Sequence, residues 1–164
     1  MNTAAEGIPS RAVHEGMERY WKDKLLGMSG RDGHFATLDA AKAKLAAFYG
    51  LSADEVSFCS CTSEAYNLLA TAIQLNEGDE VIINDLDFPA GTTPWLESAA
   101  HGVVKVWRAR DGALRVEDLA ALLSGRTRLV VTSLVSFFNG YMVPLRAMID
   151  AVRKEIALPP VEGA

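Results

Sequence analysis

The chain has 164 residues, and its 49% hydrophobic and 23% charged residues give the composition of a globular protein with enough length for one domain core. A formal net charge of −5 and an isoelectric point near 5.2 disfavour nucleic acids and anionic membrane surfaces as partners. No apolar run is long enough to span a bilayer, and residues 1–11 lack a signal-peptide pattern, so the sequence favours a cytoplasmic protein without a membrane partner.

The first third of the chain is expected to be helical. Apolar residues recur at helical spacing over residues 9–26, which predicts a first helix. Residues 27–33 have the composition of a glycine-rich loop, and residues 38–49 predict a second helix that Gly50 stops. We therefore expect an N-terminal helical segment over residues 1–50.

From residue 51 on, predicted strands alternate with predicted helices. The strands are expected at residues 55–59, 80–84, 102–107 and 128–133. The helices are expected at residues 62–75, 90–100, 116–123 and 144–154. This alternation predicts an α/β fold, a mostly parallel sheet flanked by helices, with a βαβ core at residues 51–155 and an irregular tail at residues 156–164.

The two cysteines, Cys59 and Cys61, are separated by Ser60 at the end of the first predicted strand. A disulfide between residues two apart has poor geometry, and a zinc site needs more ligands at a workable spacing. The three histidines are scattered, at His14, His34 and His101. We therefore expect two reduced thiols and no metal site.

Three segments that follow predicted strands are candidates for ligand binding, because ligands of parallel sheets bind outside the carboxyl ends of the strands. They are residues 60–64, 85–91 and 133–140. In the first segment, small hydroxyl residues precede a helix, whose free N–H groups and dipole attract anions. The segment could therefore bind a phosphate, or its Ser and Thr residues could simply cap the helix.

The second segment contains one aromatic residue, Phe88, at the carboxyl end of a strand. Such a ring could stack on a flat ligand or pack in the core or against a lid. The third segment ends in Asn139-Gly140, a turn signal, and could be a packed loop. Neither a Walker motif nor a dinucleotide glycine fingerprint is present, which weakens the interpretation as a nucleotide-binding domain.

Four segments, taken in order, resemble those of class V aminotransferases, the family that includes cysteine desulfurases, isopenicillin-N-epimerase-like proteins and kynureninase. They are residues 2–7, 56–70, 87–95 and 131–145. The resemblance covers nearly the whole chain. It implies part of the large domain of a fold-type I enzyme that uses pyridoxal 5'-phosphate (PLP) and acts on an amino acid as a transferase, an epimerase or a lyase.

The resemblance also implies roles for individual residues in holding PLP. Thr62 and Ser63, with the backbone around Cys61, would hold the phosphate. Phe88 falls where the family places a ring against the pyridine face. Glu162 falls where the family has the Asp that pairs with the pyridine nitrogen, although two prolines stand just before it.

The chain departs from the family pattern in two further places. Phe137 stands where the family often has an Asn, and the family's Schiff-base lysine would lie beyond Ala164. The lysines that are present match no such position and are expected to be solvated charges; they are Lys22, Lys24, Lys42, Lys44, Lys105 and Lys154. We therefore expect a truncated chain that holds PLP weakly or not at all and is inactive alone.

The resemblance leaves two functional hypotheses open. The first is the N-terminal part of a PLP-dependent enzyme. The alternative is a non-catalytic interaction module that forms a homo-oligomer or associates with a related full-length subunit. Phe88 slightly favours the epimerase-like and kynureninase-like branches, because desulfurases usually carry a His there.

Overall fold

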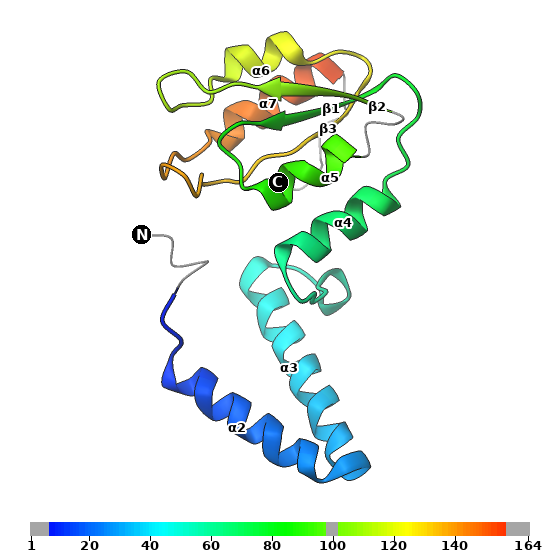
Figure 1. Ribbon diagram of the computed structural model, residues 1–164, viewed down its shortest axis with the longest axis vertical. Helices are drawn as coiled ribbons and strands as arrows, with labels where there is room; N and C mark the ends of the chain where they lie inside the picture. Colours follow the sequence, from blue (N-terminus) through cyan, green and yellow to red (C-terminus); the bar gives the residue numbers. More distant parts are fainter. Residues whose placement is uncertain (1–6, 98–101, 157–164) are drawn as a thin grey trace. The chain divides into compact units, whose positions relative to one another are not determined.

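The computed structural model describes residues 7–97 and 102–156, and the chain divides into two compact units, Met1–Phe58 and Cys59–Ala164 (Figure 1). Residues 98–101, which include the end of the helix predicted at 90–100, lie outside the described residues. So do residues 157–164, which include Glu162 and most of the predicted tail. No helix in the described ranges has the length and apolar character needed to cross a bilayer.

The first unit consists of two long helices, α2 (Arg11–Leu25) and α3 (Arg31–Tyr49), joined by a short 3-10 helix, Gly27–Gly30. Helix α3 ends where predicted, because Gly50 adopts the left-handed conformation, with φ of 68°. Its start was predicted too late, since the last part of the expected loop at 27–33 is already helical. Close packing explains the tight connection: a Cβ on Gly30 would lie 1.9 Å from the Asp23 carbonyl oxygen.

The strand predicted at residues 55–59 is wrong. Instead, Ser52 begins a 3-10 helix, Ala53–Glu55, in which the Glu55 carboxylate accepts hydrogen bonds from the Ser52 N–H at 2.8 Å and from its hydroxyl at 2.9 Å. This capping box commits the backbone to a helical turn at the point where the strand was expected to start. Cys59 and Cys61 are free and exposed, in agreement with the prediction, but no strand precedes them.

The second unit contains a three-stranded parallel sheet in the order β2-β1-β3 (Figure 1). The strands are β1 (Asp79–Asn84), β2 (Gly102–Trp107) and β3 (Thr127–Val130). The helices are α4 (Thr62–Ala72), α5 (Pro89–Glu97), α6 (Val116–Leu122) and α7 (Leu145–Ile156). The predicted α/β fold, with a mostly parallel sheet flanked by helices, is thus confirmed.

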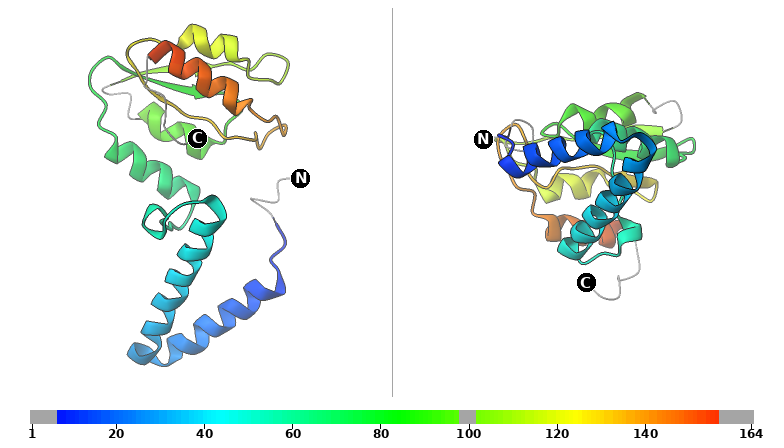
Figure 2. Two further views of the ribbon diagram at one scale, coloured as in Figure 1. Left: turned by 180° about the vertical axis from the view of Figure 1, so that it is seen from behind. Right: turned by 90° about the horizontal axis from the view of Figure 1, so that it is seen from below.

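Each face of the sheet is covered by its own helices, because side chains alternate along β1. On one face Val81, Ile83 and the buried Trp95 of α5 form a core that residues of α4 complete. On the other face Ile82 and Trp107 pack with residues of α6 and α7, the two helices seen in front of the sheet in the left view of Figure 2. β1 is therefore buried on both sides, which suits its run of β-branched residues.

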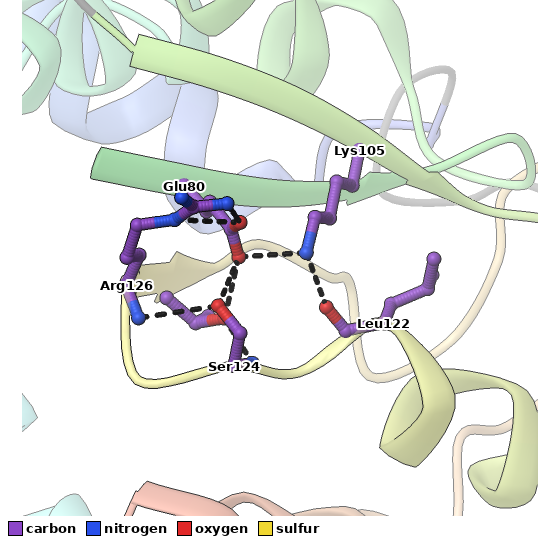
Figure 3. Close-up of polar contacts among 6 residues, drawn as sticks. Glu80, Lys105, Leu122, Ser124 and Arg126 are labelled. Carbon is purple, nitrogen blue, oxygen red and sulfur yellow. Dashed lines mark hydrogen bonds and ion pairs between the residues drawn. The ribbon is translucent and has the colours of Figure 1, made fainter. Parts of the chain in front are cut away.

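A buried carboxylate, Glu80, joins all three strands at the amino end of β1 (Figure 3). It accepts hydrogen bonds from Lys105 of β2 at 2.7 Å, from Ser124 at 2.6 Å and from Arg126 at 3.0 Å. Thr127 of β3 donates a further bond at 3.3 Å. These hydrogen bonds lower the pKa of Glu80 to about 2. The bond from Lys105 has the largest effect, followed by the bond from Ser124.

Lys105 is not the solvated charge that the sequence predicted. Its ammonium group is bound by the Glu80 carboxylate and also donates to the Leu122 carbonyl oxygen at 2.8 Å. The Lys105 side chain is 26% exposed. The sequence pattern missed this role because the two partners are 25 residues apart and only the parallel pairing of β1 with β2 brings them together.

We expect Glu80→Gln to lower the free energy of unfolding by roughly 3 kcal/mol at neutral pH, because it leaves Lys105 and Arg126 without their counter-charge. The folded-state pKa of Glu80 lies below its unfolded value of 4.5, so this contribution is complete above that value and is lost as the pH falls toward about 2. Urea unfolding at several pH values measures it. The matched control, Glu77→Gln in the exposed turn before β1, should change little, and a pH-independent difference between Glu80→Gln and wild type would contradict the expectation.

Candidate functional site

The carboxyl end of β1 is tied to the segment that follows β3. Asn84, the last residue of β1, is buried and donates from its side-chain amide to the Val131 carbonyl oxygen at 3.2 Å. Three residues later, the Asp87 carboxylate accepts hydrogen bonds from the Ser133 hydroxyl at 2.6 Å and from the Ser133 N–H at 2.9 Å. These bonds fix the loop between β1 and α5, which carries Phe88.

Helix α4 begins with Cys61 in extended conformation, and no side chain makes a capping hydrogen bond to its first turn. Thr62 and Ser63 are exposed at this N-terminus. The Glu64 carboxylate folds back to accept the Ser60 N–H at 2.5 Å, which orders the turn before the helix. The start of α4 therefore combines backbone donors, the positive end of the helix dipole and two exposed hydroxyl residues.

The Cys61 thiol shares this environment. The N–H of Glu64 and, after it, the Ser60 hydroxyl lower the pKa of Cys61, and the N–H of Ser63 adds to the effect. The negative charge of Glu64 opposes the shift. The direction of the net shift indicates that the start of α4 stabilises negative charge at this position.

One hollow, of about 400 Å³, contains two of the predicted cofactor residues, Ser63 at the start of α4 and Phe88 just before α5. The polar groups that line it come from these two helices. Its lining residues are Ser63, Asn67, Phe88, Pro89, Ala90, Thr93, Pro94 and Glu97. Cys61 and Thr62 are not among them, although they adjoin Ser63 in the chain.

Phe88 belongs to an exposed aromatic cluster. Its ring is 51% exposed and meets Phe137 edge-to-face, with 5.0 Å between the ring centroids. Phe138 lies next to Phe137 at 6.5 Å. Such edge-to-face pairs hold each other in a preferred orientation while leaving ring surface open to a ligand.

The loop that carries Phe137 and Phe138 is anchored at three points. The Ser136 hydroxyl donates to the Leu86 carbonyl oxygen at 2.9 Å. The Asn139 amide donates to the Gly112 carbonyl oxygen at 2.7 Å, and the Tyr141 hydroxyl to the Leu114 carbonyl oxygen at 2.8 Å. The segment at 133–140 is thus the packed loop that the sequence allowed, with its two Phe rings displayed outward.

The sequence had singled out the segments around these residues but not the polar side chains that organise them. Asn84, Asp87 and Ser133 were missed because their partnership depends on the pairing of β1 with β3. Tyr66 of α4 was missed too; burial, and secondarily the charge of Asp87, raises its pKa. The available signal was the position of Asn84 and Asp87 at a strand end, directly before an aromatic residue.

Residues 9–164 match the profile of the family described as aminotransferase class-V. The chain belongs to this family. Over 136 residues, this chain is 35% identical to a cysteine desulfurase of Pectobacterium atrosepticum. The alignment covers 79% of this chain and 33% of that protein. The chain spans about a third of the length of the curated relatives that it matches.

Two solved structures share the fold of this class V chain. A mutant of C-DES with glycine covalently linked to its PLP cofactor superposes with a TM-score of 0.81 at 17% identity, covering 91% of this chain and 41% of that one. The cysteine desulfurase CsdA of Escherichia coli gives a TM-score of 0.78 at 21% identity, covering 92% of this chain and 41% of that one. PLP, present in the C-DES structure, is the cofactor of the family.

The residues described above fit the two ends of PLP. An uncapped helix start with exposed hydroxyl groups suits a phosphate, and an exposed aromatic face suits a flat ring. Ser63 and Phe88 line the same hollow, so one ligand could contact both. Glu162, the residue predicted for the pyridine nitrogen, lies outside the described residues, and its role stays a prediction.

The lowered pKa of Cys61 gives a direct test of the start of α4. In a Cys59→Ser background, we expect iodoacetamide to alkylate Cys61 with a pH midpoint below that of an ordinary thiol, because the thiolate is the reacting form. Adding Ser60→Ala should raise the midpoint, since it removes a hydroxyl that favours the thiolate. Mass spectrometry of timed samples measures the rates; equal midpoints with and without Ser60 would contradict the assignment.

Proposed function

We propose that this chain forms the phosphate-binding and ring-binding part of a PLP site in a class V aminotransferase-fold enzyme that acts on an amino acid as a transferase, an epimerase or a lyase. The observation that carries the proposal is the hollow that joins Ser63, at the start of α4, to Phe88, at the carboxyl end of β1. Its location agrees with the rule that ligands of parallel sheets bind beyond the carboxyl ends of the strands.

Thr62 and Ser63 hold the phosphate in this proposal, with the N–H groups around Cys61. The phosphate takes the place that the uncapped helix start leaves open, where backbone donors and the dipole favour an anion. The same environment already favours negative charge on the Cys61 sulfur. The Ser63 hydroxyl adds a donor inside the hollow, and Thr62 adjoins Ser63 in the chain.

Phe88 contacts the face of the cofactor ring and sets its plane. Its own orientation is fixed by the edge-to-face contact with Phe137. When bound, PLP supplies an electron sink for bonds at the α-carbon of an amino acid, and the protein supplies position and surroundings. Thr93 and Asn67 line the hollow beside Phe88. The Asn67 Nδ2 already donates to the Ser63 carbonyl oxygen at 2.8 Å, so the Thr93 hydroxyl is the better placed group for a polar amino-acid substrate.

Covalent attachment of PLP is not expected at this hollow. No lysine is among the residues that line it, and Lys105 is held by Glu80 at the opposite, amino end of β1. We therefore propose that the 164-residue chain holds PLP through phosphate and ring contacts alone and turns over no substrate by itself.

Binding of 4-deoxypyridoxine 5'-phosphate tests the proposal, because this analogue of PLP lacks the aldehyde and cannot react with surface lysines. We expect the wild-type chain to bind it, and Ser63→Ala and Phe88→Ala each to weaken binding by about tenfold, the size of one lost polar or stacking contact. Equilibrium dialysis measures the affinity. The phosphate-free analogue, 4-deoxypyridoxine, should bind more weakly to wild type and be insensitive to Ser63→Ala.

The matched control is Ser57→Ala, a hydroxyl in the same chain outside the hollow, which should leave the affinity unchanged. Two results would contradict the proposal. One is an affinity that none of the site variants alters. The other, obtained with PLP itself, is a stoichiometric pyridoxyl group on a single lysine after borohydride reduction.

The second candidate function, a non-catalytic interaction module, is supported by the exposed apolar side chains of α2. None of the described residues of this helix is buried, and Met17 and Trp21 are 68% and 64% exposed. Apolar surface of this kind is typical of association with a second chain, either another copy or a related subunit.

Light scattering after size-exclusion chromatography tests this candidate. We expect the wild-type chain to self-associate and Met17→Glu to shift it toward the monomer, because a charge in the apolar stripe opposes its burial. Glu15→Lys, a charge change at another exposed position of α2, is the control and should not change the mass. A wild-type chain that remains a monomer at all concentrations would count against self-association.

A further inference from the structure

Each oxygen of the Asp87 carboxylate accepts two hydrogen bonds. Its Oδ1 atom accepts hydrogen bonds from the Ser133 hydroxyl at 2.6 Å and from the Phe88 N–H at 2.9 Å. Its Oδ2 atom accepts from the Ser133 N–H at 2.9 Å and from the Asn84 amide at 3.3 Å. A carboxylate can accept at both oxygens, whereas an Asn side chain would turn an NH₂ group toward two of these donors.

These four bonds connect three parts of the second unit. Asn84 is the last residue of β1, Ser133 follows β3, and Phe88 leads into α5. The bond to the Phe88 N–H acts on the backbone of that residue itself. The bonds to Ser133 hold the start of the segment that carries Phe137, the ring that packs against Phe88.

We propose that Asp87 is a positioning residue, which fixes the aromatic pair of Phe88 and Phe137 in the orientation that receives the cofactor ring. This inference rests on the proposed function, because it assigns how the ring-binding side of that same site is held. Asp87 does not line the hollow, and it acts through Phe88.

Tyr66 lies close to the Asp87 carboxylate. A Cβ added to Gly91 would lie 3.5 Å from the Tyr66 hydroxyl oxygen and 3.5 Å from Asp87 Oδ1, so both side chains flank Gly91. The charge of Asp87 contributes to the raised pKa of Tyr66, after burial. The carboxylate is thus enclosed by α4, the first turn of α5 and the segment after β3, a setting that suits a fixed support.

The test uses the full chain, the probe 4-deoxypyridoxine 5'-phosphate and the variant Asp87→Asn. We expect about tenfold weaker binding of the probe and loss of the circular dichroism induced in its pyridine band, because the ring loses a fixed aromatic neighbour. Competition by inorganic phosphate should be unchanged, since the start of α4 is untouched. Asp87→Glu, which keeps two acceptor oxygens, should restore part of the induced signal.

Asp85→Asn is the matched control. Asp85 directly follows β1, but it accepts the Ala109 N–H at 2.8 Å, beside β2. It should leave probe binding and induced signal unchanged. If Asp87→Asn fails to fold, Ser133→Ala replaces it, because it removes the 2.6 Å bond, keeps the carboxylate and should reduce the induced signal.

The outcomes separate the two proposals. A wild-type chain that does not bind the probe removes the proposed function and, with it, the role of Asp87. Normal wild-type binding with unchanged signal in Asp87→Asn overturns the positioning role alone. Parallel losses of probe binding, phosphate binding and thermal stability would show that Asp87 only supports the fold, and would equally overturn it.

Discussion

The second unit depends on β1 being held by a carboxylate at each end. Glu80 binds Lys105 of β2 and the residues that lead into β3 at the amino end, and Asp87 binds Ser133 just past the carboxyl end. Both are acceptor-only groups among donors, which makes their bonds short and costly to remove. The first clamp lies away from the hollow and supports stability. The second is next to Phe88, which lines the hollow, and there we propose that it fixes the orientation of the Phe88 ring.

The parts of the fold that were predictable are those in which local pattern and tertiary packing agree. Residues 102–107 form a strand with the predicted bounds, and β1 begins one residue before its predicted start. The prediction failed at residues 55–59, where the Ser52–Glu55 capping box outweighs the strand preference of Val56 and Phe58. It was late at α3, where Gly30 packs directly on the backbone of Asp23. In both places a specific short-range contact determines the backbone conformation, and hydrophobic periodicity does not indicate such contacts.

The candidate site was predictable only in outline. Phe88 stands out because strand ends in parallel sheets bind ligands. Ser63 was singled out after a strand that does not form, yet the structure brings it to the same hollow as Phe88. Asp87 and Ser133 are 46 residues apart, and a bond between them follows from the order β2-β1-β3, which the sequence does not specify. The aromatic contact between Phe88 and Phe137 depends on the same order. Long-range partners therefore require the topology before they can be assigned.

Phe137 distinguishes this candidate site from the family pattern. The resemblance to the family predicts an Asn at that position, whereas this chain places an aromatic ring edge-to-face with Phe88. In the proposed site, the side of the hollow next to Phe88 would hold a ligand by packing. The polar groups that line the hollow come from α4 and α5, at Asn67 and Thr93 among others. Packing contacts fix the plane of a ring but not its rotation within that plane. In the proposed site, phosphate contacts at Ser63 would help to set this rotation, so the start of α4 and the Asp87 hydrogen bonds would have complementary roles.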